Sequence, residues 1–140
     1  MYVNLDLNSL VLLLRDRAEL VNLLPGWLTA EKPYYEQQTP YAYLESISLP
    51  ANPNSVNARH IITLTVVMGS DGTDREFKEI ITVFDNLVMS TVDWCLPIKQ
   101  VWEVRILGVS KWQSHQKFRY SEKWNLILSQ DYYFDVVTVK

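Results

Sequence analysis

The stretch from Arg59 to Val88 constrains the fold more than any other, because it combines a strand, a turn and a helix in direct succession. Its first part, RHIITLTVVM, is rich in β-branched residues and alternates in polarity, which is typical of a strand. Glycine, serine and aspartate then supply turn residues at 69–72. Apolar residues follow at helical spacing and predict one apolar stripe of a helix, made of Phe77, Ile80, Ile81, Phe84, Leu87 and Val88.

The turn before this helix contains Asp71, Gly72, Thr73 and Asp74, residue types that also occur in metal and phosphate loops. Thr73-x-x-Glu76 is a capping box, in which two side chains satisfy the unpaired N–H groups at a helix start. Asp74 in the first turn meets the positive end of the helix dipole. The order of acids needed by an EF-hand and the Gly-Lys-Ser/Thr of a P-loop are both missing. We therefore interpret the segment as a structural turn with a capped helix.

Residues 41–49, YAYLESISL, predict another strand, because their apolar side chains share one face of a period-two pattern that only Glu45 interrupts. We expect this strand to pair antiparallel with residues 59–68. The loop between them, residues 50–58, is longer than a hairpin needs, and a loop of this kind often contacts a partner.

The C-terminal part of the chain predicts a further hairpin. Residues 101–109 alternate in polarity as a strand does, and the polar segment 110–116, with Trp112 at its centre, predicts the loop. Alternation at 117–129 predicts the returning strand. Residues 131–140, DYYFDVVTVK, are hydrophobic and β-prone, which is unusual for a free terminus because a terminus that nothing holds will fray.

Apolar residues at helical spacing from Leu10 to Leu24 predict a first helix, which the following Pro-Gly pair would end. Residues 25–40 hold three prolines and two adjacent tyrosines without a clear period. We interpret them as a long crossing segment with room for a short strand.

Length, charge and cysteine content exclude several classes of protein. The 140 residues predict a single domain over 1–140. The net charge is −3 and the basic residues are scattered, which argues against a surface that binds nucleic acid. The longest apolar run, Leu10 to Leu14, is far shorter than the ~20 residues that span a bilayer. Because Cys95 is the only cysteine and no secretory signal pattern is present, we expect synthesis in a reducing cytoplasm.

The sequence offers few groups for catalysis or cofactor binding. Cys95 lies between two apolar residues, which fits an inert core thiol better than an activated one. A three-ligand zinc site would need Cys95 together with both His60 and His115, or carboxylates in place of some of them. Asp131 and Asp135 could serve as paired acids, but their position around YYF is more typical of polar residues flanking a hydrophobic strand. We therefore expect no enzyme activity, no cofactor and no metal.

Aromatic residues are frequent, with five Trp, eight Tyr and four Phe. Several lie in segments that resemble loops or termini: Tyr34, Tyr35, Trp112, Tyr132 and Tyr133. Most aromatic residues of this kind cover a sheet as part of the core, while some anchor protein interfaces. Stacking of RNA bases on the sheet is a third interpretation, but the strands lack the glycine-aromatic pattern that such a sheet shows.

The order of elements resembles the small tail terminator (tail completion) proteins of long-tailed bacteriophages, including the lambda-type and related siphophage families. The resemblance covers nearly the whole chain and rests on its size, the element order, the PYAYLESISL strand and the strand-turn-helix from Arg59 to Ser90. It implies an α+β fold with one mainly antiparallel sheet of about four to six strands and two helices packed on one face. The long stretch from Pro25 to Thr39 departs from this pattern at the docking of the first helix.

The same resemblance implies a structural virion protein in the tail or neck. Such proteins form a six-fold ring that caps the tail tube, ends its polymerisation and offers a docking surface to the head-completion (stopper) protein. DNA passes through the lumen without specific binding, and the partners are further copies of the chain, the tail tube protein and the stopper protein. No catalytic residue, cofactor or membrane contact is implied.

Candidate interface residues come from the features of this sequence. The loop at 50–58 could reach a neighbouring ring, Trp112 lies at the predicted hairpin tip, and 131–140 could be a subunit-contacting strand that joins the sheet edge of an adjacent subunit. The candidates are Pro50, Asn52, Asn54, Trp112, Tyr132, Tyr133 and Phe134.

Three other functions fit the same sequence. A head-closure protein or another neck connector shares the size and the lack of motifs. A non-phage intracellular protein-binding module would stay monomeric and offer a concave pocket. A small enzyme would need titrating groups with shifted pKa values in a cleft.

Overall fold

The structure is a computed structural model that describes residues 7–15, 17–33, 38–46, 57–69, 72–99, 102–120 and 126–139. Within these ranges the chain forms three helices and six strands. The helices are α1 (Leu7–Leu14), α2 (Ala18–Val21) and α3 (Asp74–Met89). The strands are β1 (Leu28–Thr29), β2 (Tyr41–Ser46), β3 (Asn57–Gly69), β4 (Cys95–Lys99), β5 (Trp102–Tyr120) and β6 (Leu126–Val139).

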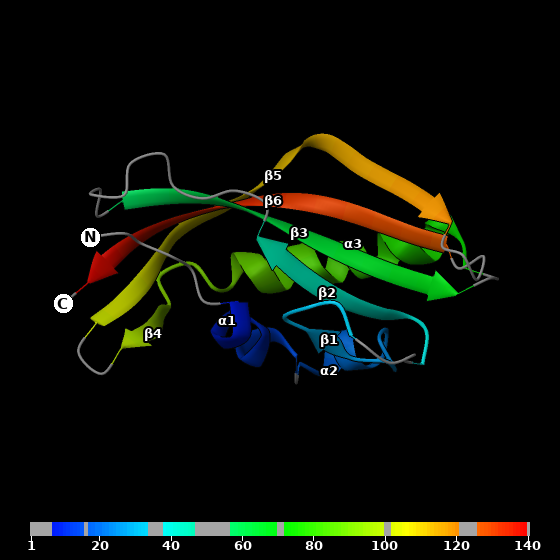
Figure 1. Cartoon of the computed structure of the whole chain (residues 1–140), viewed down its shortest axis with the longest axis horizontal. Helices are drawn as coiled ribbons and strands as arrows, with labels where there is room; N and C mark the ends of the chain where they lie inside the picture. The colour runs from blue at the N-terminus through cyan, green and yellow to red at the C-terminus, as the bar shows by residue number, and fades with distance from the viewer. Residues whose placement is uncertain are drawn as a thin grey trace.

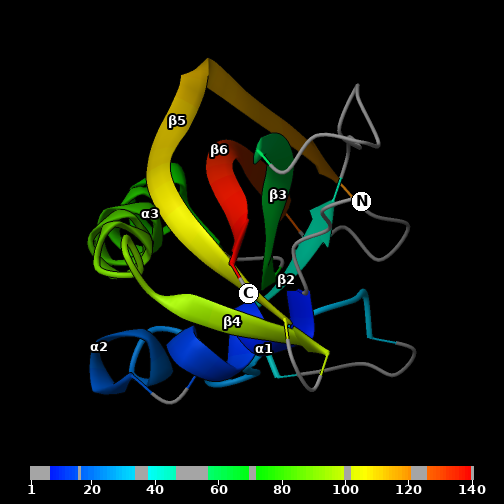
Figure 2. The same cartoon turned by 90° about the vertical axis from the view of Figure 1, so that its left-hand side faces the viewer.

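All of these strands belong to one sheet in the order β1-β2-β3-β6-β5-β4 (Figure 1). β1 and β2 run parallel, and the other neighbouring pairs are antiparallel. Side chains from all three helices join those of the sheet in one buried apolar cluster. Figure 2 shows the helices gathered on one side of the curved sheet. The predicted α+β fold with one mainly antiparallel sheet is therefore confirmed.

α3 forms where the sequence predicts an amphipathic helix. The Thr73 hydroxyl accepts a hydrogen bond from the Glu76 backbone N–H at 3.2 Å and donates one to the Glu76 carboxylate at 3.2 Å. At the other end, the Ser90 N–H donates to the Asn86 carbonyl. The predicted stripe faces the core, with Leu87 partly buried and the others fully buried: Phe77, Ile80, Ile81, Phe84 and Val88. The predicted helix and its Thr73 cap are confirmed, while the Glu76 carboxylate accepts from the Thr73 hydroxyl and not, as a capping box requires, from the Thr73 backbone N–H.

The sequence predicted one continuous helix from Leu10 to Leu24, and this prediction is wrong. It is split into α1 and α2, and the Arg17 N–H donates to the Leu14 carbonyl in the tighter turn between them. Leu14 and Leu20 are both buried. Six residues separate them, so a straight helix would point them in different directions. The break allows both side chains to reach the core.

The predicted position of the C-terminal hairpin loop is also wrong. β5 continues through 110–116, and the connection to β6 falls at 121–125, outside the described residues. Lys111 pairs with Tyr132 and Gln116 with Gln130, so the intervening residues 112–115 form a bulge opposite a single residue of β6. The predicted loop is thus an irregularity within a strand.

The C-terminal segment lies in the middle of the sheet. Residues 131–137 of β6 pair with β3 on one side, and most of them also pair with β5 on the other. Both backbone edges are therefore used within the chain, so this segment cannot join a neighbour's sheet edge without breaking two ladders. Contact with a neighbouring subunit through its side-chain face stays a prediction.

Candidate interaction surface

A largely apolar groove runs between α3 and β5. It holds about 230 Å³ and is lined by Asp85, Val88, Met89, Val109, Ser110, Lys111 and Tyr132. Met89 exposes 53% of its surface at the end of the groove. The groove forms where β5 lies close to α3. Val109 of β5 packs there against the buried apolar cluster shared by the sheet and the helices.

Three polar groups of this groove, from β6, α3 and β5, are connected to one another. The Tyr132 hydroxyl donates a 2.5 Å hydrogen bond to Asp85 Oδ1, and Lys111 Nζ lies 2.6 Å from Asp85 Oδ2. Tyr132 is only 1% exposed, and burial is the main cause that raises the pKa of its phenol far above the ordinary value. The hydrogen bond to the Asp85 carboxylate raises the pKa further. The phenol therefore stays protonated and acts as a fixed donor, which gives it no acid–base role near neutral pH.

Tyr132→Phe is expected to make the protein more tolerant of alkaline pH. The Tyr132 pKa is raised on folding from an ordinary value of 10.0, so its contribution to stability is complete below pH 10 and is lost as the pH rises above it. The parent chain should lose about 1.4 kcal/mol of unfolding free energy per pH unit there through this group. Urea unfolding at pH 9 and pH 11 should show a smaller loss in the variant; equal losses would contradict the assignment.

On the opposite face of the sheet, β3 and β6 carry a row of polar pairs. Arg59 Nε donates to Asp135 Oδ1 at 2.7 Å, and Nη2 lies 3.3 Å from Oδ2. The guanidinium carbon also lies 5.0 Å from the centre of the Tyr133 ring, within cation–π range. Hydrogen bonding to Asp135 raises the pKa of Arg59, whose charge is permanent. Further along, the Thr63 hydroxyl donates to Asp131 at 2.6 Å. These pairs fix the register of the two central strands.

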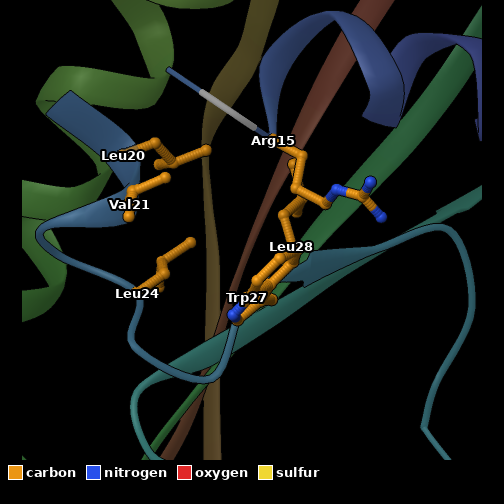
Figure 3. Close-up of a pocket in the computed structure, with 6 residues that line it drawn as sticks. All are labelled: Arg15, Leu20, Val21, Leu24, Trp27 and Leu28. Carbon is orange, nitrogen blue, oxygen red and sulfur yellow. The ribbon is translucent and has the colours of Figure 1, made fainter. Parts of the chain in front are cut away.

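A small pocket lies where α1, α2 and β1 meet (Figure 3), lined by Arg15, Leu20, Val21, Leu24, Trp27 and Leu28. The leucines and Val21 from the α2 region face Trp27, over which the Arg15 guanidinium lies 5.1 Å from the ring centre. The enclosed space is about 30 Å³, enough for a water but not for a substrate. Trp27 is 57% exposed and has a φ of 77°, a strained region for a bulky residue. Its ring lines this pocket and is still largely exposed to solvent.

Several large apolar side chains are exposed in the N-terminal part of the chain and near the end of α3 and in β5. Among the residues whose side chains are described, they are Leu12, Val21, Trp27, Met89, Trp94 and Leu107. Exposed apolar side chains of this size are available for contact with a partner.

The structure places the contact residues predicted from the sequence in different environments. Tyr132 and Phe134 are each 1% exposed and belong to the core, so the prediction that they offer a contact surface is wrong for the folded chain. Tyr133 is half-buried on the opposite face, beside Arg59. The backbone of Trp112 lies in the β5 bulge. The loop candidates Pro50, Asn52 and Asn54 lie outside the described residues.

The residues considered for chemistry are not brought together. Cys95 lies in the edge strand β4, His60 is buried in β3, and His115 lies in the bulge of β5. Asp131 and Asp135 each bond to a side chain of β3. Over the described ranges, no three His, Cys, Asp or Glu residues are placed to hold a metal, and no helix there is long and apolar enough to cross a membrane.

Sequence reasoning missed the groove because its walls come from distant parts of the chain. Asp85 and Met89 lie on the partly polar side of α3, and Lys111 lies in a segment predicted as a loop. No local pattern signals their proximity. The only available signal was Met89 itself, an apolar residue that falls outside the predicted stripe.

Comparison with known proteins gives a likeness of fold. No protein-family model and no curated protein sequence matches the chain. Among solved structures, a chain from the virion of a native gene transfer agent (GTA) particle matches with a TM-score of 0.65 and 16% identity, over 94% of this chain and 93% of that one. A second solved structure, without a functional description, matches with 16% identity over 90% of both chains. Its TM-score of 0.49 is too low to support a conclusion about the fold or the function. The chain thus shares its fold with a component of a virion particle.

Proposed function

We propose that this protein is a structural component of a phage-like virion. The observation that carries the proposal is the fold shared with a chain of the gene transfer agent virion, over more than nine-tenths of both chains. A match that covers 94% of this chain extends over its helices and its strands, not over one local motif. The separated positions of the cysteine, histidines and acids fit an association role better than a catalytic one.

Within such a particle, we propose the role of tail terminator: a hexameric ring that caps the tail tube, ends its polymerisation and offers the head-docking surface. The order of elements in the sequence supports this role. Exposed apolar side chains in the N-terminal part, such as Trp27, and at the end of α3, such as Met89, are candidates for two contact surfaces. A ring needs two different contact surfaces on each subunit. Its partners would be other copies, the tail tube protein and the stopper protein, with DNA in the lumen and the protein located in the tail or neck of the virion.

Native mass spectrometry over a concentration series, with negative-stain imaging of the same samples, tests this role. Hexamers with a central hole are the expected result. Trp112→Ala, in the β5 bulge, is expected to reduce the hexamer fraction at a given concentration. Rings of another symmetry would favour a different neck connector. A chain that stays monomeric even with purified tail tube protein would contradict the terminator role and favour a binding module.

A further inference from the structure

The outer edge of β5 is only partly covered. β4 pairs with β5 at residues 102–105, and backbone hydrogen bonds with Asp93 and Trp94 cover Ile106. Beyond Ile106, no strand in the described part of the chain pairs with this side of β5, although β5 is nineteen residues long. Figure 1 shows this part of β5 arching along the border of the sheet. We call residues 107–111 the β5 edge, and an uncovered edge of this kind can pair with a further strand.

The β5 edge is accessible from solvent. Leu107 exposes 48% of its surface, and Ser110 is exposed. A Cβ at Gly108 would meet nothing within 4 Å, so nothing crowds the strand on that face. Lys111 Nζ lies 2.6 Å from Asp85 Oδ2, which holds this side chain toward α3. Another chain can therefore approach the backbone of β5 here.

The register shows which backbone groups point outward. The Ile106 N–H donates to the Trp94 carbonyl at 3.0 Å and its carbonyl accepts from the Asp93 N–H at 2.7 Å, so both groups point away from β6. Ile106, Val109 and Lys111 pair with β6 residues that lie two positions apart in turn. Antiparallel ladders alternate with this period. The N–H and carbonyl groups of Val109 and Lys111 therefore also face outward.

The apolar groove lies directly beside the β5 edge. Val109, Ser110 and Lys111 form its β5 wall, and Val88 and Met89 form its α3 wall. The lysine of this wall is already paired with the aspartate of α3. An occupant is therefore selected by backbone hydrogen bonds and apolar contact, not by charge. A strand added to β5 would direct alternate side chains into the groove.

The first six residues of the sequence, MYVNLD, have the pattern that such a strand needs. They precede α1 and lie outside the described residues, and we call them the arm. The apolar residues Met1, Val3 and Leu5 alternate with Tyr2, Asn4 and Asp6. This period-two pattern, without glycine or proline, is typical of a strand with one apolar face. Six extended residues span about 20 Å. A short strand suits the β5 edge, because the bulge at 112–115 ends its regular stretch.

The arm does not reach the β5 edge of its own chain. Leu7, where α1 begins, lines a groove together with Leu44 of β2. β2 and β5 are three strand spacings apart in the sheet, or about 14 Å. If residues 3–5 lie on the edge, the two residues that connect them to Leu7 span at most about 7 Å. Figure 2 likewise shows β5 rising away from α1. An arm on this edge therefore comes from another copy.

We propose that residues 1–6 of one copy add to the β5 edge of the next copy as a short antiparallel strand. Val3 pairs with Lys111 and Leu5 with Val109, so the outward backbone groups of both β5 residues enter the ladder. The side chains of Val3 and Leu5 then lie on the helix side of the sheet, in the apolar groove. Arm and edge are different surfaces, so each further copy can repeat the contact, which closes into a ring when the rotation allows it. The inference rests on the proposed ring and names its subunit contact.

Cysteine cross-linking tests this register. Asn4 lies opposite Ser110 in the proposed ladder, with Cα atoms about 4.5 Å apart, which is within disulfide range. The double variant Asn4→Cys/Ser110→Cys is expected to give a ladder of covalent oligomers under oxidation. Each single variant, and the parent chain with Cys95 alone, should stay largely uncross-linked. Dimers of Ser110→Cys alone would indicate a symmetric β5–β5 contact and overturn the proposal. A cross-link inside monomers of the double variant would place the arm on its own chain and overturn it as well.

Mixing two variants that each lose one half of the contact tests its head-to-tail nature. Val3→Asp/Leu5→Asp disables the arm, and Val109→Pro removes an outward N–H from the β5 edge. Under conditions in which the parent forms hexamers, with tail tube protein where assembly needs it, the dissociation constant of each variant alone should rise by about tenfold or more. A mixture in which one variant is isotope-labelled should give one-to-one dimers in native mass spectrometry. The intact arm of one variant fits the intact edge of the other, and neither chain can be extended further.

Matched controls separate loss of the contact from loss of the fold. Tyr2→Asp/Asn4→Asp adds the same charge on the other side of the arm, and Val109→Thr keeps the N–H and the branched shape, so both should assemble like the parent. Circular dichroism and urea unfolding show whether the disabled variants are folded, and the cross-linking result decides where one of them is not.

The remaining outcomes distinguish this contact from the ring itself. Hexamers from either disabled variant alone would overturn the contact and leave the ring role standing. Folded monomers that give no mixed dimers would overturn the contact too. A parent chain that stays monomeric even with tail tube protein would contradict both the contact and the terminator role.

Discussion

Phe84→Ala is expected to lower the free energy of unfolding by about 3–5 kcal/mol. Phe84 is 1% exposed, and its ring lies 5.3 Å from that of Tyr132 at 57°, where α3 meets the centre of the sheet. Truncation leaves a cavity that the rigid strands cannot close. Urea unfolding followed by tryptophan fluorescence measures the loss. Thr82→Ala, on the exposed side of the same helix, is the control and should change stability by less than about 0.5 kcal/mol.

A loss below about 1 kcal/mol for Phe84→Ala would mean that α3 is not held on the sheet as the structure has it. The variant also probes assembly, because α3 forms one wall of the groove beside β5. A domain of this size has only about 5–15 kcal/mol of stability, so the folded and assembly-competent fraction should fall with it. Raising the total concentration of the variant should restore assembly only to the extent that it raises the concentration of folded subunits.

Local sequence patterns predicted the elements whose signals are complete within a few residues. α3 was predictable because its stripe, its Thr73 cap and its preceding turn agree with one another. β3 was predictable because it is rich in β-branched residues and is followed directly by turn residues. The mainly antiparallel sheet followed from the hairpin order that the sequence suggests.

The errors occur where distant contacts override local pattern. The pattern from Lys117 to Ser129 is interrupted at Glu122, within the polar run 121–123, and this interruption is the signal for the connection at 121–125 that the prediction overlooked. The register of β5 against β6 is set by cross-strand pairs such as Phe118 with Leu128. The predicted first helix breaks because Leu14 and Leu20 must reach the same core. Both outcomes depend on the sheet, which local windows do not contain.

The contact residues were the hardest part to predict. The sequence suggested aromatic residues in apparent loops, yet Tyr132 fills the core and the exposed tryptophans are Trp27 and Trp94 among the described residues. Exposure of a tryptophan depends on what covers it, and that cover comes from elements far away in the sequence. Within the described residues, the part of the β5 edge that β4 does not cover likewise follows from unequal strand lengths, here five residues of β4 against nineteen of β5.

Gly26→Ala is expected to destabilise the chain by about 3 kcal/mol, at the upper end of the cost of overpacking. A Cβ at Gly26 would lie 1.7 Å from the Gln38 carbonyl oxygen and 2.6 Å from Tyr41 Cβ, and the first of these is backbone that cannot rotate away. The Gly26 N–H also donates to the Pro40 carbonyl at 3.1 Å, a bond that holds the start of β1 against β2. Displacing the Gly26 backbone would break this hydrogen bond and loosen the packing of β1 on β2.

Gly108→Ala is the matched control for this prediction, since a Cβ at Gly108 meets nothing within 4 Å and alanine suits a strand slightly better than glycine. Thermal unfolding of the two variants should therefore differ clearly, with Gly26→Ala melting far below the parent and Gly108→Ala close to it. Similar melting of both would mean that the Gly26 turn does not pack against residues 38–41. Because that turn sets where β1 starts on β2, Gly26→Ala should also weaken the pairing of β1 with β2, while Gly108→Ala leaves that pairing unchanged.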